Sequence, residues 1–77
     1  MEIWSTKYAL TAGIKHHLSA KQVSQTMVKY APGCYLHHAE WHITQAAAMK
    51  RAEEMRQKRI ASLRKTLTKL ELMSFDA

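Results

Sequence analysis

Residues 44–73 read TQAAAMKRAEEMRQKRIASLRKTLTKLELM. This segment contains neither Gly nor Pro, and residues of high helix propensity dominate it, so it predicts one long helix. Thr44 is suited to be the N-cap, because a threonine hydroxyl can accept a hydrogen bond from the first helical turn. The roughly 29 residues from Gln45 to Met73 would reach about 43 Å at about 1.5 Å per residue. Since a small sheet is shorter than this, the far end of the helix must pack on a second copy, on a partner, or on nothing.

Apolar residues recur on one side of this helix when successive positions are placed about 100° apart. In the C-terminal half they form a short heptad seam of a and d positions. The seam consists of Ile60, Leu63, Leu67 and Leu70, and Phe75 follows it as a further apolar anchor. In the N-terminal half the stripe continues through Met49 and Ala52, with Ala48, Met55 and Met73 at its edge. The sequence therefore predicts an Ala/Met half that packs on a sheet and a Leu half that reaches beyond it.

The Leu half predicts a homodimer, because a small domain commonly needs an oligomer partner for support. In a parallel pair, Arg59 at a g position would face Arg64 at an e position of the second copy, and these like charges would repel. We therefore expect an antiparallel pair or a different partner.

The first 43 residues predict a three-stranded antiparallel sheet. Residues 3–14 alternate in the manner of a half-buried strand, with the even-numbered side chains toward the core. Residues 23–31 predict a second strand, for which a short helix is the alternative, and residues 34–43 a third. The Pro32-Gly33 pair predicts the turn between these last two strands. The aromatic residues expected in the core of the sheet are Trp4, Tyr8 and Trp41.

These elements predict a single α+β domain over residues 1–77, with the sheet in 1–43 and the long helix in 44–74. A chain of 77 residues has room for one domain, whose stability is marginal. Cys34 is the only cysteine, which excludes an internal disulfide and favours a reducing compartment. No apolar run reaches the roughly 18 residues of a membrane span, and no signal peptide is recognisable. We therefore expect a cytoplasmic protein that does not contact a membrane.

The chain is basic, with 12 Lys and Arg against 6 Asp and Glu, a formal charge of +6. Such a charge attracts phosphate and acidic proteins. The candidates for contact with a partner or with phosphate are Arg51, Arg56, Lys58, Arg59, Arg64, Lys65 and Lys69. A row of cations on a rigid helix can bind a phosphate backbone by releasing counterions. The solvated face of an ordinary amphipathic helix has the same composition, and no base-reading motif accompanies the charge.

Metal binding has weak candidates in the third predicted strand, where Cys34, His38 and His42 would share one face. Cys and His can hold zinc, but these residues lack the usual ligand spacing and would need His16 or His17 from another element. Catalysis is not expected either, because the sequence has no Gly-rich phosphate loop and no nucleophile elbow. We therefore predict a protein that is not an enzyme and has no cofactor, with a zinc-stabilised interaction module as an alternative.

Several short stretches carry a resemblance to a known group of proteins. They are KYALTAGI at residues 7–14, WHIT at 41–44, AEEMR at 52–56, KRIASLRK at 58–65, KLE at 69–71, and Phe75. In these stretches the chain resembles small, largely uncharacterised phage and prophage accessory proteins that have a Trp-His-x-Thr start to a long basic C-terminal helix. Residues 16–35 do not follow this pattern, and no functional residue can be carried over.

The resemblance implies a phage protein that acts in the cytoplasm of a bacterial host. Small phage accessory proteins often bind and disable a host machine, so the implied partner is a host protein complex for nucleic-acid processing or defence. The expected function is therefore inhibition or modulation of such a complex by binding, and the alternative is direct binding of nucleic acid by the basic helix.

Overall fold

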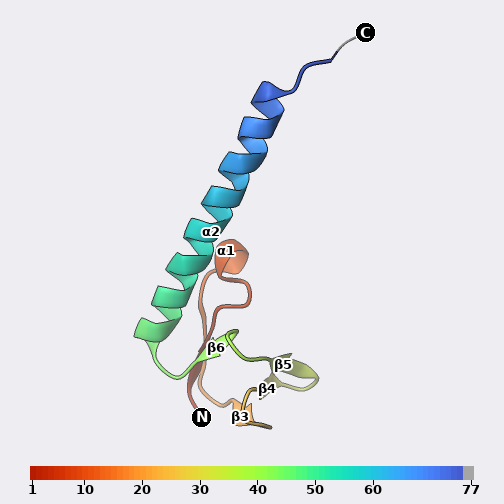
Figure 1. Ribbon diagram of the computed structural model, residues 1–77. Helices are drawn as coiled ribbons and strands as arrows, with labels where there is room; N and C mark the ends of the chain where they lie inside the picture. Colours follow the sequence, from red (N-terminus) through yellow and green to blue (C-terminus); the bar gives the residue numbers. More distant parts are fainter. Residues whose placement is uncertain (76–77) are drawn as a thin grey trace.

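Two small antiparallel sheets and one long helix make up the computed structural model, which describes residues 1–75 (Figure 1). This arrangement confirms the predicted α+β class, although the sequence predicted one sheet. The first sheet has the order β2-β1-β6, from β2 (Lys15–His17), β1 (Ile3–Ser5) and β6 (Trp41–His42). The second has the order β3-β4-β5, from β3 (Lys21–Gln22), β4 (Val28–Ala31) and β5 (Cys34–Leu36).

The first predicted strand, residues 3–14, is wrong in its length. The chain leaves the sheet after Ser5, forms the short helix α1 (Ala9–Ala12), and returns as β2 to pair antiparallel with β1. Ala and Leu in α1 favour helix over strand, and Gly13 ends the helix with a φ of 79°, which glycine adopts without strain. The period-two alternation over residues 3–14 therefore spans the strand β1 and the helix α1, and not one strand.

The predicted even-numbered core face is also wrong for β1. Within β1 the odd-numbered Ile3 and Ser5 are buried, whereas Trp4 is half-buried and its ring stacks on His16 at 4.6 Å. Thr6, just after β1, is an even-numbered residue that is buried. Tyr8 is 54 % exposed and does not belong to the core. A shift of one residue moves every side chain of a strand to the other face of the sheet. A short alternation therefore does not by itself determine which of its two sets of side chains is buried.

The second and third predicted strands exist in part. The Pro32-Gly33 turn is confirmed: it joins β4 to β5, and Gly33 has a φ of 72°. Residues 34–43 do not form one strand, because the chain turns around His38 and Ala39, which has a φ of 70°. Its first part pairs in the second sheet, and its last part, β6, pairs with β1 in the first sheet. This division is why there are two sheets.

The buried core lies where the two sheets meet and is small, as a chain of this length allows. Its fully buried cluster consists of Ile3, Ala20, Val28 and Leu36, with Tyr30 and Trp41 packed against it. Trp41 also donates a hydrogen bond from Nε1 to the carbonyl oxygen of Thr26 at 3.0 Å. Of the three aromatic residues expected in the core, Trp41 is thus the one that packs on this cluster.

The long helix α2 spans Gln45–Leu72 and ends two residues before the predicted position. Thr44 is its N-cap as predicted, and its hydroxyl accepts a hydrogen bond from the Ala47 N–H at 3.1 Å. The first half of α2 packs against α1, β1 and β6 through buried Ala48 and half-buried Ala52 and Met55. Met49, which the sequence placed in this contact, is 58 % exposed, because it lies about 100° around the helix from Ala48.

The second half of α2 extends beyond both sheets, which gives the chain an elongated shape of 59 × 26 × 21 Å (Figure 1). Every residue from 61 to 72 is exposed. The sequence predicted this overhang from the length of the helix alone. We call residues 61–72 the free half of α2.

Candidate partner-binding surface

An apolar row runs along the free half of α2. It is the predicted seam of Ile60, Leu63, Leu67 and Leu70, which we call the leucine seam. Its three leucines are between 50 % and 59 % exposed, and Ile60, nearest the sheets, is half-buried. Just past the helix, Phe75 is 88 % exposed. Contiguous exposed apolar side chains on a monomer commonly mark an interaction site, so this row is the first component of the candidate surface.

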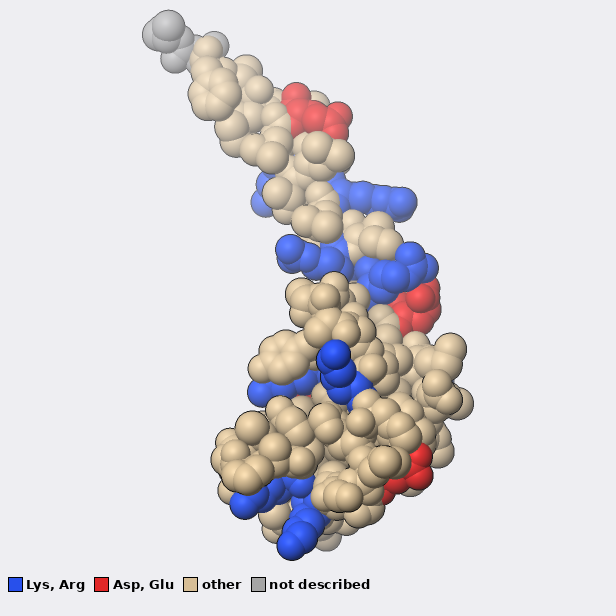
Figure 2. All heavy atoms as spheres, turned by 180° about the vertical axis from the view of Figure 1, so that it is seen from behind, with Lys and Arg blue, Asp and Glu red and all other residues tan. Residues whose placement is uncertain are grey.

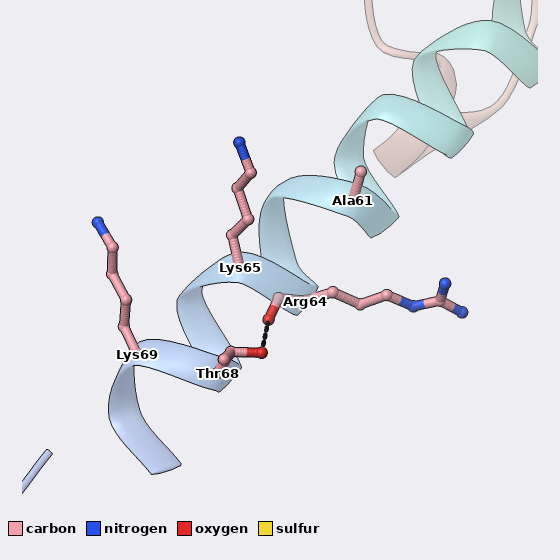
Figure 3. A pocket seen from close by; sticks show the side chains of 5 residues that line it. All are labelled: Ala61, Arg64, Lys65, Thr68 and Lys69. Carbon is pink, nitrogen blue, oxygen red and sulfur yellow. Dashed lines mark hydrogen bonds between the residues drawn. The ribbon is translucent and has the colours of Figure 1, made fainter. Parts of the chain in front are cut away.

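Cationic side chains form the second component. Figure 2 shows Lys and Arg projecting from both flanks of the exposed part of α2. In the close view, Lys65 and Lys69 point to the same side of the helix and Arg64 to another (Figure 3). Together with Ala61 and Thr68 they line a hollow that is open to solvent, because all five side chains come from one helix. Lys58 precedes Lys65 by seven residues and therefore falls on the same side.

Two of the predicted contact residues lie elsewhere. Arg56 donates two hydrogen bonds to the Glu53 carboxylate, at 2.9 and 2.6 Å. These bonds, together with one from the Gln57 amide, lower the pKa of Glu53 to about 2. Arg51 is half-buried where α2 meets the sheets, and its Nη1 atom lies 3.8 Å from Oε2 of Glu54. Arg56 is thus paired within the helix, and Arg51 belongs to the contact between α2 and the sheets.

The other predicted cations are exposed. Within residues 1–75, none of the following is in an ion pair: Lys58, Arg59, Arg64, Lys65 and Lys69. The free half itself contains three cationic residues and one acidic residue, Glu71, so its net charge is positive. The leucine seam and these five cations together are what we call the partner-binding surface.

The weak metal candidates are not brought onto one strand. Cys34 is on β5 in the second sheet, His38 is in the turn, and His42 is on β6 in the first sheet. The Nε2 atom of His42 lies 3.0 Å from the Thr6 hydroxyl. In the part of the chain that is described, no three His, Cys, Asp or Glu side chains are grouped so as to hold a metal ion.

A polar junction fixes the start of α2 on the first sheet, and sequence reasoning missed it. Thr6 is buried; its N–H donates to the Glu40 carbonyl at 2.9 Å, and its hydroxyl donates to the Ala39 carbonyl at 3.3 Å. The Glu40 carboxylate accepts from the His37 N–H at 2.7 Å. These bonds hold β6, and hence the N-cap of α2, close to β1. Because the two Thr6 bonds join residues more than thirty positions apart, no local sequence pattern predicts them.

Two histidines on the first sheet, His17 and His42, make stability dependent on pH. Partial burial, and then the positive charge of Arg51, lower the pKa of His42 below its usual value of 6.5. Burial and the neighbouring His16 and Lys15 do the same for His17. The unfolded chain therefore binds more protons than the folded chain as the pH falls through 6.5. Stability that is present above this pH is lost as the pH falls toward the lowered folded-state values.

We expect the free energy of unfolding to decrease between about pH 7.5 and about pH 5.5, and urea titrations at a series of pH values would measure this. A double variant, His17→Gln with His42→Gln, should have a flatter dependence over the same range. The readout is the slope with pH and not the absolute stability, since the substitutions also change contacts with Thr6 and Tyr30. An unchanged slope in the double variant would assign the dependence to other groups.

Within residues 1–75, no helix combines the length and the apolar character that are needed to cross a membrane. The chain matches no protein-family model, no curated protein and no solved structure.

Proposed function

We propose that the protein is a phage-encoded accessory protein that is not an enzyme and that binds a host complex for nucleic-acid processing or defence. It acts in the cytoplasm of the bacterial host and inhibits or modulates that complex. The observation that supports this most is the free half of α2, which presents apolar and cationic side chains on a rigid helix with every residue exposed. The resemblance to small phage proteins supports the host context.

The two components of the partner-binding surface have different roles in this proposal. The leucine seam and Phe75 supply the buried contact area that holds the complex together. The exposed cations steer the approach to a negatively charged partner and raise the association rate. Because the helix is already formed in the free protein, little conformational entropy is lost on binding.

Affinity capture tests the proposal. The tagged protein is incubated with nuclease-treated host lysate, and the retained proteins and the mass of the complex are determined by mass spectrometry. We expect a stoichiometric host protein that resists nuclease and moderate salt. The variant Lys58→Glu with Lys65→Glu should lose this protein while its thermal unfolding is unchanged, because both lysines are exposed.

A matched control has the same change of charge on the sheets, Lys15→Glu with Lys21→Glu, where both lysines are also exposed. The control should retain the host protein. If the Lys58 and Lys65 variant retains it as well, the cationic side of α2 is only a solvated surface. If no host protein is retained by the unmodified chain, the proposal fails.

Direct binding of nucleic acid is the second candidate, and the row of Lys58, Lys65 and Lys69 favours it. These lysines are free of ion pairs within residues 1–75 and lie along one side of a straight helix. If they contact phosphates, the logarithm of the affinity for DNA or RNA should fall linearly with the logarithm of the salt concentration. A flat response, or no binding at low salt, would exclude this candidate, whereas capture of nucleic acid alone would favour it over the host protein.

A further inference from the structure

Two arginines and one carboxylate, Glu71, occupy the charged e and g positions beside the leucine seam. With the seam at the a and d positions of a heptad, Arg59 occupies a g position and Arg64 an e position. Both side chains are exposed, and within residues 1–75 neither is in an ion pair. Charges at e and g positions lie beside the seam and contact the helix that covers it, so they determine which partner helix is accepted.

A second copy of the chain would bring these arginines together. In a parallel pair, Arg59 of each helix faces Arg64 of the other. In an antiparallel pair that matches Ile60 with Leu70 and Leu63 with Leu67, the two-fold axis passes near residue 65, and the two copies of Arg64 lie next to each other. Like charges across such an interface disfavour the pairing in both directions, and in the antiparallel pair Glu71 of each copy offsets only part of the repulsion.

The leucine seam is also too short for the apolar area that a second copy would bury to offset this repulsion. It stops at Ile60, because the preceding d and a positions hold Arg56 and Glu53, which are paired with each other. From Ile60 to Leu70 the helix rises about 15 Å. A stable interface buries about 800 Å² on each partner, which one helix face of this length does not provide. This limit holds for any single covering helix, so the partner has to add ion pairs with Arg59 and Arg64 and further contacts outside that helix.

We infer that the leucine seam is covered by an acidic amphipathic helix of the partner protein, and not by a second copy of this chain. The partner helix has apolar residues at its own a and d positions and Glu or Asp beside them, which pair with Arg59 and Arg64. It belongs to a folded protein, because an isolated helix that matches so short a seam is unstable in water. The inference rests on the proposed function, since it gives the chemistry of the partner surface.

A synthetic helix can serve as the probe. The peptide is held helical by lactam bridges on its outer face, has Leu at every a and d position and Glu at every e and g position, and bears a fluorescent label. Its twin has Lys in place of every Glu. In anisotropy titrations with the full-length protein, the glutamate probe should bind at least about tenfold more tightly than the lysine twin.

The charge-reversed variant Arg59→Glu with Arg64→Glu should invert this preference and bind the lysine twin more tightly. The matched control, Lys15→Glu with Lys21→Glu, makes the same change in total charge on the sheets, outside the partner-binding surface, and should still prefer the glutamate probe. Equal loss in both variants would mean that net charge alone attracts the probe, and the inference would be wrong. Binding of both probes with equal affinity would overturn it as well.

Sedimentation of the protein alone tests the alternative occupant. We expect a monomer, and a dimer that dissociates in the variant Leu67→Asp would show that a second copy covers the seam. Displacement of the glutamate probe by a DNA oligonucleotide would instead assign the surface to nucleic acid. A host protein captured from lysate through a surface that is not acidic would overturn this inference and leave the proposed function intact.

Discussion

Replacing Leu36 with Ala is expected to remove most of the stability of the chain. Leu36 is 1 % exposed and lies in the only fully buried cluster of residues 1–75, against Ile3 and Val28. Truncation of a buried leucine to alanine costs about 2–5 kcal/mol, from lost transfer energy and from the cavity that is left. Domains in general are stable by only about 5–15 kcal/mol, and one of this size is at the low end. Urea unfolding followed by tryptophan fluorescence would measure the loss, because Trp41 packs on the same cluster.

The matched control is the same truncation on the leucine seam, Leu67→Ala. Leu67 is 56 % exposed, and it lies beyond the contact between α2 and the sheets. Its replacement should change the free energy of unfolding by less than about 0.5 kcal/mol. Equal destabilisation by the two variants would mean that the free half of α2 is buried in solution, for example by self-association, and would contradict the description of this half as exposed.

The helix could be predicted from the sequence because the information that sets it is local. An unbroken run of good helix formers after Thr44 is sufficient to predict α2, and the threonine hydroxyl caps it as expected. That α2 extends beyond the sheets could be predicted from the length of the helix alone. The sheets could not be predicted to the same degree, because strand pairing joins distant residues. Nothing near Trp41 indicates that β6 leaves the sheet of β5 and pairs with β1.

The partner-binding surface was predictable to different degrees for its two components. The leucine seam follows from spacing, and the structure exposes it as the length of the helix required. Among the cations, the pairing of Arg56 with Glu53 has a signal in the sequence, since residues three apart are neighbours on a helix. The burial of Arg51 has no such signal, because it depends on which face of α2 meets the sheets.

Introducing two carboxylates into the leucine seam is expected to abolish capture of the host protein. In the variant Leu63→Asp with Leu67→Asp, the two aspartates lie one turn apart on the surface that the partner must cover. Burying them would leave desolvated charges without partners, and such a penalty is far larger than the loss of two apolar contacts. The sheets should be unaffected, because every residue of the free half is exposed. Affinity capture and urea unfolding of the same variant would test both statements.

The control for this variant is Ala61→Asp with Thr68→Asp, which adds the same two charges at exposed b positions. These residues lie outside the a, d, e and g positions that a covering helix contacts. If the leucine seam is the contact, the control retains the host protein although its helix carries the same added charge. If both variants lose the host protein, the cause is the reduced positive charge of α2, and the cations rather than the seam hold the partner. If neither variant loses it, the partner binds elsewhere on the chain, and the free half of α2 is not the site.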